Sequence, residues 1–332
     1  MNISVLGDGA WGSAIAHLLC TNKHNVTMWG PFPDYILEMQ KLRSNPRFLP
    51  KIKFSENINF TSDIKEAVLN SEILVLALPS QYIRTLLKNI KPFLDKEKHI
   101  LVDLAKGIEV NSLKRMSEVV EEVLGETNYT VLSGPSHAEE VIMNIPSAVV
   151  VASKNPNSSK IVQDAFISPV FRVYQSTDPT GVELGGALKN VYSLAAGVVD
   201  GMKLGDNTKA ALLTRSIAEM SRLGKALGGG TETFSGLSGI GDLIVTCYSK
   251  HSRNRFVGEK LGSGYKLNEI LKELNMVVAE GVKTTESAYQ LAKKIGVESP
   301  IINELYEALY NDKDPRICIN DLMSRAATTE IY

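Results

Sequence analysis

A glycine-rich turn near the first residue, set between an apolar run and an amphipathic run, constrains the fold of this chain most. The turn GDGAWG spans residues 7–12, follows the apolar run 3–6 and opens a stretch of helical spacing over 10–19. In such a turn the first glycine permits the bend, the second lets backbone approach a pyrophosphate, and the third lets helix and strand pack closely. The helix start adds amide donors and a positive dipole end. The turn therefore predicts a dinucleotide site, in which Trp11 either covers the cofactor or fills the core. The predicted cofactor-binding residues are Gly7, Gly9, Ala10, Trp11 and Gly12.

The first half of the chain alternates short apolar runs with longer amphipathic ones, a pattern typical of parallel strands joined by crossover helices. The expected buried strands are 3–6, 26–29, 73–78, 100–104 and 130–132. Helical spacing occurs over 10–19, 82–90 and 113–124. Two further strands, 148–152 and 171–174, flank a helix at 157–166. We predict an α/β fold with an N-terminal, Rossmann-type doubly wound sheet.

From about residue 178 the pattern changes to long runs of helical period, with glycines or prolines at the breaks. The expected helices are 180–201, 207–227, 256–262, 267–274, 283–295 and 300–310. This predicts an all-α C-terminal domain and places the boundary near residue 175. The predicted domains are 1–175, which binds the dinucleotide, and 176–332, which holds substrate and catalytic residues. Neither repeats nor a low-complexity linker separate them, so we expect the two to pack around a shared cleft.

The bulk composition excludes several classes of protein. The chain has 332 residues and a net charge of -1, with acids and bases interspersed, which argues against a nucleic-acid partner. It shows no secretory signal pattern and no apolar stretch long enough for a membrane span, so we expect no stable membrane insertion. The cysteines Cys20, Cys247 and Cys318 form no CxxC pair, which predicts neither disulfides nor a metal site and indicates a reducing cytoplasm.

The end of the second expected strand should carry the residue that distinguishes NAD from NADP. An acidic side chain there suits the ribose 2′-hydroxyl of NAD, and a basic one suits the 2′-phosphate of NADP. The strand instead ends in Trp29-Gly30-Pro31, with neither charge type. Asp34 is expected to start the following helix. The sequence therefore leaves the choice between NAD and NADP open.

Polar residues follow two other strands at the edge where open α/β sheets bind ligands. Lys106 follows the strand 100–104 and either faces the substrate or lies solvated in its loop. The segment 133–138 turns from a strand into a helix and offers amides and a hydroxyl to the same crevice. His137 in this segment suits acid–base chemistry, but a packing role at the helix start is favoured.

The second half contributes an amine, a carboxylate and a group of anion-binding donors. Lys189 lies in a helix of small and apolar residues, where burial lowers a lysine pKa toward the range that proton transfer needs. Asp242, in a glycine-rich segment, is its expected partner; a structural salt bridge is the alternative. Ser252, Arg253 and Asn254 combine a hydroxyl, a planar guanidinium and a carboxamide, a set suited to phosphate or to an ordinary surface turn.

Taken together, these motifs resemble the soluble NAD(P)-dependent glycerol-3-phosphate dehydrogenase family almost from end to end. The motifs that carry the resemblance are 7–12, 106–109, 133–136, 185–190, 236–246, 252–254 and 280–282. The last three are more specific than the dinucleotide turn. A β-hydroxyacid or ketopantoate reductase would keep the turn and the helical domain but would lack residues 252–254 beside 236–242. A nucleotide-sensing module would lack the lysine and the aspartate.

The resemblance implies interconversion of dihydroxyacetone phosphate and sn-glycerol 3-phosphate, with NAD or NADP as cofactor and Lys189 as the proton donor and acceptor. It also implies a homodimer that supplies glycerol 3-phosphate for phospholipid synthesis. The implied catalytic residues are Lys189, Lys106 and Asp242. The implied substrate contacts are Lys106, Gly134, Ser136, Lys189, Asp242, Ser252, Arg253 and Asn254. The implied cofactor contacts beyond the turn are Pro31, Lys106, Ala138, Arg253, Val278 and Glu280.

Two positions depart from the family pattern. Pro31 stands where bacterial members often carry a basic residue, which weakens any preference for NADP. His137 stands where an aromatic residue such as Phe is common, so contacts there are expected to differ in detail.

Overall fold

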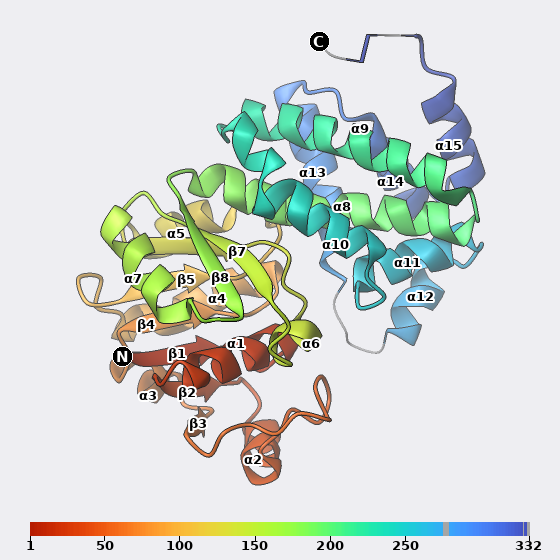
Figure 1. The fold of residues 1–332 in the computed structure, drawn as a ribbon. Coiled ribbons are helices and arrows are strands. Elements are labelled where there is room, and N and C mark those ends of the chain that lie inside the picture. Colours follow the sequence, from red (N-terminus) through yellow and green to blue (C-terminus); the bar gives the residue numbers. More distant parts are fainter. Residues whose placement is uncertain (275–278, 328, 331–332) are drawn as a thin grey trace.

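The fold is seen in a computed structural model that describes residues 1–274, 279–327 and 329–330. Its N-terminal part is one eight-stranded sheet with the order β3-β2-β1-β4-β5-β6-β7-β8 (Figure 1). Adjacent strands are parallel except β6 and β7, which pair antiparallel. The order reverses at β1 and β4, as a doubly wound sheet requires. The strands are β1 Asn2–Leu6, β2 Asn25–Trp29, β3 Ile58–Thr61, β4 Ile73–Leu76, β5 Ile100–Asp103, β6 Asn128–Ser133, β7 Ser147–Ala152 and β8 Phe171–Ser176.

Helices cover both faces of the sheet, and each face has its own apolar core. Apolar residues of α1, α2, α6 and α7 pack on one face, and those of α3, α4 and α5 pack on the other. Burial on both faces explains why the central strands are continuous apolar runs and do not alternate. The helices are α1 Ala10–Thr21, α2 Pro33–Leu42, α3 Ile64–Leu69, α4 Ser80–Ile90, α5 Met116–Leu124, α6 Ala138–Val141 and α7 Pro156–Phe166.

The expected strands and helices are present, but the short helix α3 was not predicted, and the structure corrects two further places in this part. The strand β3 was not predicted, because it is a short edge strand in which only Ile58 is buried. Helix α5 begins at Met116 and not at residue 113, because Leu113 has a left-handed backbone with φ 58° that cannot start a helix. Asp34 lies in the first turn of α2, as predicted.

After Ser176 every regular element in the described part of the chain is helical. The long helix α8 contacts α9, α10, α11, α13 and α14, and its first turns also pack on β6 and β7, so it joins the two parts (Figure 1). Helices α10 and α15 were not among the predicted helices. The helices are α8 Pro179–Gly201, α9 Gly205–Ala226, α10 Asp242–Tyr248, α11 Arg253–Gly262, α12 Leu267–Glu273, α13 Glu280–Ile295, α14 Pro300–Tyr310 and α15 Pro315–Met323, with short turns η1 Lys91–Phe93, η2 Thr231–Ser235 and η3 Leu237–Gly241.

Glycines allow α8 and α11 to touch backbone to backbone. A Cβ on Gly197 of α8 would lie 2.1 Å from the carbonyl oxygen of Arg255, and a Cβ on Gly258 of α11 would lie 1.9 Å from that of Leu194. Neither distance is compatible with any larger side chain unless the helices separate. The contact therefore fixes the spacing of the two helices that carry Lys189 and Arg253.

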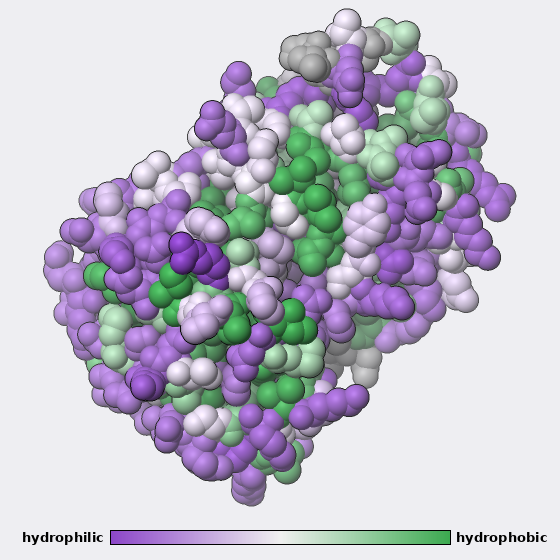
Figure 2. Space-filling model, in the orientation of Figure 1, coloured by the Kyte–Doolittle hydropathy of each residue, from purple (hydrophilic) through white to green (hydrophobic). Residues whose placement is uncertain are grey.

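The surface is mixed in character. Figure 2 shows hydrophilic residues over most of the face in view, with hydrophobic residues gathered over the helical part near its junction with the sheet. On α10, Ile244 and Tyr248 are 46% and 54% exposed. Among the described helices none combines the length and the hydropathy that a membrane span needs. The division of the chain into domains 1–175 and 176–332 stays a prediction.

Candidate active site

The candidate site lies where the carboxyl ends of the parallel strands meet the helical part. Lys106 follows β5, and Gly134 follows β6, so both lie at the edge of the sheet that is typical of ligand sites. Lys189 comes from the middle of α8, and Asp242 is the first residue of α10. Segments far apart in the sequence thus bring two amines and one carboxylate to the same place.

Asp242 bridges the two lysines. Its Oδ1 lies 3.0 Å from Lys189 Nζ, and its Oδ2 accepts a hydrogen bond of 2.6 Å from Lys106 Nζ. Lys189 also donates to Thr246 Oγ1 at 2.8 Å, and that hydroxyl donates to the backbone oxygen of Asp242 at 2.6 Å. Lys106 also donates to the backbone oxygen of Gly134 at 3.0 Å. An ammonium has three donors, so each lysine retains one for a ligand after these described contacts.

Burial and neighbouring charge set the pKa values of this cluster. Lys189 is 6% exposed and Asp242 1% exposed. Burial lowers the pKa of Lys189, Asp242 opposes that shift, and the nearby Lys106 charge adds to it. Burial alone would raise the pKa of Asp242, but the ammonium groups of Lys106 and Lys189 outweigh it, and the pKa is lowered. The cluster therefore holds an ionised carboxylate beside an amine that releases its proton more readily than a surface lysine.

A chain of carboxamides ties the helical part to the Lys106 loop. Asn190 Nδ2 donates to the backbone oxygen of Lys106 at 2.8 Å, and its Oδ1 accepts from Asn254 Nδ2 at 2.9 Å. Asn254 Oδ1 in turn accepts from the backbone N–H of Gly281 at 3.0 Å. These contacts hold the side chain of Asn254 between α8 and α13. The residue as a whole is 8% exposed. Thr246 and Asn190 complete the site but were not among the predicted site residues.

The two residues beside Asn254 differ from it in accessibility. Ser252 is buried and caps α11, because its Oγ accepts from the backbone N–H of Arg255 at 3.2 Å. Arg253 is exposed, and within the described ranges its side chain makes no hydrogen bond or ion pair. Burial raises the pKa of Glu280, and the nearby positive charge of Arg253 opposes that shift. Arg253 therefore offers an exposed guanidinium one position before Asn254, at the start of α11.

The dinucleotide turn has the geometry that a pyrophosphate requires. A Cβ on Gly7 would lie 2.4 Å from the backbone oxygen of Ala77, and a Cβ on Gly12 would lie 2.2 Å from that of Gly7, so both positions need glycine for packing. A Cβ on Gly9 would meet nothing within 4 Å. Gly9 caps α1 without a side-chain hydrogen bond, so open space lies before the amides of a helix N-terminus. These residues fit a dinucleotide.

The end of β2 carries no charged side chain that could distinguish the ribose of NAD from that of NADP, as predicted. A basic residue, Arg47, lies near the glycine turn instead. Pro31 is exposed and follows Gly30, whose Cβ would lie 2.6 Å from Asp8 Oδ2. Arg47 lies with its guanidinium 4.0 Å from the centre of the Tyr35 ring. Burial raises the pKa of Asp8, and the Arg47 charge opposes that shift. No pattern in the sequence links Arg47 to the turn, because a separate loop carries it.

The remaining predicted contacts lie around the same edge. Ser136 Oγ donates to the backbone oxygen of Gly134 at 2.8 Å. His137 is the residue before α6, and Ala138 begins that helix. Burial lowers the pKa of His137 to about 4, so the ring is neutral near pH 7 and is poorly suited to act as an acid. Glu280 begins α13 and accepts from the backbone N–H of Ser80 at 2.7 Å. The predicted contact Val278 lies outside the described residues.

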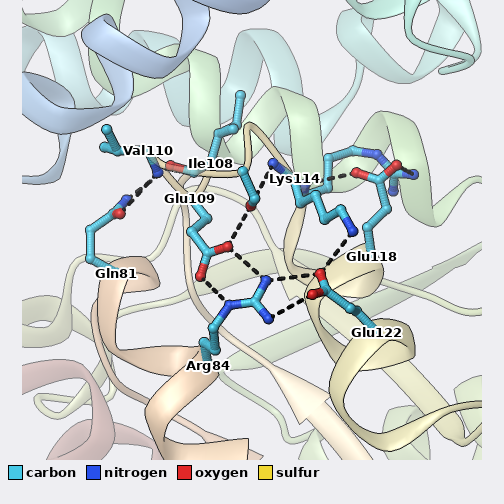
Figure 3. Close-up of polar contacts among 10 residues, drawn as sticks. Gln81, Arg84, Ile108, Glu109, Val110, Lys114, Glu118 and Glu122 are labelled. Carbon is cyan, nitrogen blue, oxygen red and sulfur yellow. Dashed lines mark hydrogen bonds and ion pairs between the residues drawn. The ribbon is translucent and has the colours of Figure 1, made fainter.

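The loop after Lys106 is clamped by α4 and α5 (Figure 3). Gln81 donates to the backbone oxygen of Ile108 at 2.9 Å and accepts from the N–H of Val110 at 3.1 Å. Arg84 donates to both oxygens of Glu109, at 2.9 Å and 2.8 Å, and also reaches Glu122 on α5. Such paired contacts fix orientation as well as distance. The clamp holds in place a loop that has no regular secondary structure of its own.

Comparison with known proteins matches both parts of the chain. The family model for the NAD-dependent glycerol-3-phosphate dehydrogenase N-terminus matches residues 2–159, and that for the C-terminus matches residues 178–320. A glycerol-3-phosphate dehydrogenase (NAD(P)+) from Citrifermentans bemidjiense is 48% identical, over 99% of this chain and 98% of its own length. The chain belongs to the NAD-dependent glycerol-3-phosphate dehydrogenase family. The resemblance found in the sequence motifs is thus confirmed.

Solved structures of this family agree. The crystal structure of glycerol-3-phosphate dehydrogenase from Coxiella burnetii is 36% identical, with a TM-score of 0.94 and coverage of 98% of this chain and 99% of that one. A ketopantoate reductase from Ralstonia eutropha is 14% identical, with a TM-score of 0.61 over 97% of this chain and 100% of that one. The second likeness shows the fold alone. The predicted fold class is confirmed, and the two-part plan is shared with the rival reductase class.

Proposed function

We propose that this protein is an NAD(P)-dependent glycerol-3-phosphate dehydrogenase that interconverts dihydroxyacetone phosphate and sn-glycerol 3-phosphate. The observation that carries the proposal is the Lys106–Asp242–Lys189 cluster, in which Asp242 and Lys189 are buried and Lys106 is partly buried, at the ligand-binding edge of a dinucleotide fold. When bound, the reduced nicotinamide supplies a hydride to C2 of the ketone. The developing alkoxide then needs a proton, and the cluster holds one on an amine.

In the proposed mechanism Lys189 gives its proton to the alkoxide, and as a neutral amine it takes the proton back in the reverse direction. Asp242 and Thr246 occupy two of the three Lys189 donors, which directs the third toward the substrate. Lys106, held by Asp242 and Gly134, places a second positive charge where the oxygen becomes negative. General acid catalysis of this kind typically contributes about 10²–10⁴-fold.

The phosphate of the substrate is proposed to bind at Arg253. This guanidinium is exposed and unpaired within the described residues, and its planar fork suits a phosphate. Binding energy from the phosphate would position the carbonyl for reaction. The further proposed substrate contacts are Gly134, Ser136, Ser252 and Asn254. Of these, Asn254 is already committed to contacts with α8 and α13, so a direct contact with substrate would use its remaining amide hydrogen.

The proposed cofactor site runs along the same edge from the glycine turn. The open face of Gly9 supports pyrophosphate binding there. Trp11 has a buried indole N–H without a hydrogen-bond partner in the described chain. The proposed cofactor residues are Gly7, Gly9, Ala10, Trp11, Gly12, Pro31, Lys106, Ala138, Arg253, Val278 and Glu280.

We further infer a homodimer in the cytoplasm that supplies glycerol 3-phosphate for phospholipid synthesis. The exposed apolar residues Ile244 and Tyr248 of α10 support self-association, because apolar surface of this kind is stabilised by burial. Sedimentation of the purified protein tests this: a monomer at micromolar concentration would contradict it.

The function is tested with a panel of ketone substrates and each reduced nicotinamide, monitored at the cofactor's absorbance. Dihydroxyacetone phosphate should be the preferred substrate, and NADH and NADPH should differ in kcat/KM by less than about 100-fold, or 2.7 kcal/mol. Lys189→Ala should lower kcat by about 10²-fold or more with nearly unchanged cofactor binding. A preference for ketopantoate or a β-hydroxyacid would overturn the proposal, and a Lys189→Ala variant that keeps more than about a tenth of kcat would make Lys189 structural.

A further inference from the structure

A second buried polar chain lies beneath the site and joins the elements that carry its two lysines. Asp103 is the last residue of β5, three positions before Lys106. Glu183 lies on α8, six positions before Lys189. Between the two carboxyl groups lies the hydroxyl of Tyr129, from β6, which is 3.0 Å from Asp103 Oδ2 and 2.8 Å from Glu183 Oε1.

The two carboxyl groups differ in how their charge is compensated. Glu183 accepts hydrogen bonds from Arg115 Nη1 at 2.5 Å and from both the backbone N–H and the hydroxyl of Ser117 at 2.7 Å. Asp103 is fully buried, and among the residues that the structure describes its other oxygen accepts only from the backbone N–H of Ala105, at 3.0 Å. Within the described residues Asp103 has no ion pair. An ionised Glu183 is therefore stabilised, whereas an ionised Asp103 would be an uncompensated buried charge.

Hydrogen counting points the same way. Tyr129 has one hydroxyl hydrogen but two carboxyl neighbours. If both carboxyl groups were ionised, the Tyr129 hydroxyl could donate to only one of them. Its contact with the other would then place two oxygens together without a hydrogen between them. The hydrogen of Tyr129 goes to the charged Glu183, and a proton on Asp103 completes the second contact. The acid and base groups around Asp103 are Tyr129, Glu183 and Glu280. Burial raises the pKa of Asp103 to about 8, and the charges of Glu183 and Glu280 add to that effect.

We propose that Asp103 is held as a neutral carboxylic acid and is a positioning residue, whose chain through Tyr129 to Glu183 fixes β5 and α8 relative to each other. Asp103 also accepts from Ala105, in the loop that reaches Lys106. The hydrogen-bonded series Asp103–Tyr129–Glu183 therefore sets the separation of the two amines, Lys106 and Lys189, on either side of Asp242. Asp103 touches no substrate, and it acts through the placement of the two amines. The inference rests on the proposed function only for its effect on turnover.

The protonation state is tested by infrared spectroscopy of the intact protein. Burial raises the pKa of Glu219 to about 7, so this carboxyl group contributes to the same spectral region, and the test uses Glu219→Gln as the parent protein. The parent should show the carbonyl band of a protonated carboxylic acid at pH 6 and pH 7, and adding Asp103→Asn should remove a component of that band. If Asp103→Asn leaves the band of the parent unchanged at both pH values, Asp103 is ionised and the proposal fails.

Turnover tests the positioning role. Asp103→Asn keeps a donor toward Tyr129 and an acceptor toward Ala105, so it should retain kcat within about threefold, while Asp103→Leu and Tyr129→Phe should lower kcat by about 10–100-fold. The KM for the cofactor should stay nearly constant in all three. Equal activity of the Leu and Asn variants, with both folded by circular dichroism, would overturn the role. The infrared result stands apart from activity, so it remains decisive even if wild type does not reduce dihydroxyacetone phosphate.

Discussion

Replacing Asp242 with Asn removes the charge that links the two lysines, and it tests the proposed mechanism directly. The carboxylate lies 3.0 Å from Lys189 Nζ and 2.6 Å from Lys106 Nζ, and Asn keeps its shape. Two unit charges about 4 Å apart interact by about 4 kcal/mol at an effective dielectric constant of about 20. Loss of that attraction should lower the pKa of Lys189 further, because the carboxylate that opposes the effect of burial is gone.

Loss of the Asp242 charge therefore favours the neutral amine of Lys189 over its acid form. Burial already lowers the pKa of this amine, and Asp242 is the group that raises it. In Asp242→Asn the reduction of dihydroxyacetone phosphate should therefore drop by about 10²-fold or more at pH 8. Part of the loss should be recovered at pH 6, because protonation restores the acid. The measurement is kcat for reduction from pH 6 to pH 9 at saturating cofactor.

Thr246→Val is the matched control. It removes the other Lys189 contact, of 2.8 Å, without changing charge, so its loss of kcat should be smaller and nearly independent of pH. A ratio of Asp242→Asn to wild-type activity that stays constant from pH 6 to pH 9 would refute the argument. Asp242 would then orient the lysines without tuning their protons.

Three further outcomes are expected. Arg253→Ala should lower kcat/KM for dihydroxyacetone phosphate about 10–150-fold, with Arg253→Lys in between; an equal loss with unphosphorylated dihydroxyacetone would show that Arg253 does not read phosphate. Because the pKa of Asp103 is raised from 3.8 to about 8, its stabilising contribution is complete below about pH 4 and is lost as pH rises to about 8. The unfolding free energy of wild type relative to Asp103→Asn should thus fall by about 3 kcal/mol from pH 5 to pH 7, and a difference independent of pH in urea titrations would contradict this. Gly197→Ala should lower the unfolding free energy by about 1–3 kcal/mol, since its Cβ would lie 2.1 Å from a backbone oxygen; unchanged thermal unfolding would show that α8 and α11 can separate freely.

Local pattern was enough to predict most of the fold. The central strands are apolar runs because they are buried on both faces, and glycines or prolines mark the ends of the long helices. The edge strand Ile58–Thr61 escaped prediction, because one buried residue in four gives no pattern. The late start of α5 was not predicted either, because Leu rarely adopts the left-handed backbone that Leu113 has.

The sequence likewise predicted part of the candidate site and missed other parts. Lys106, Lys189 and Asp242 were predicted because each stands in a distinctive motif, and the structure brings them together. The contact between Tyr129 and Glu183 is not encoded in any local pattern, because the residues lie on β6 and α8. Arg47 likewise approaches the turn from a separate loop. Such pairs are set by tertiary packing, which a single sequence does not display.

The bare backbone contact between α8 and α11 has a consequence for motion in the enzyme. Where Gly197 and Gly258 meet the opposite helix, no side chains lie between the backbones that could change rotamer as the helices slide. Because the backbones touch directly, the two helices are expected to behave as one rigid unit. Lys189 lies on one helix and Arg253 starts the other. If Lys189 carries the proton and Arg253 binds the phosphate, as proposed, this contact fixes the distance between the two groups, and substrates in which the carbonyl and the phosphate are further apart should react poorly.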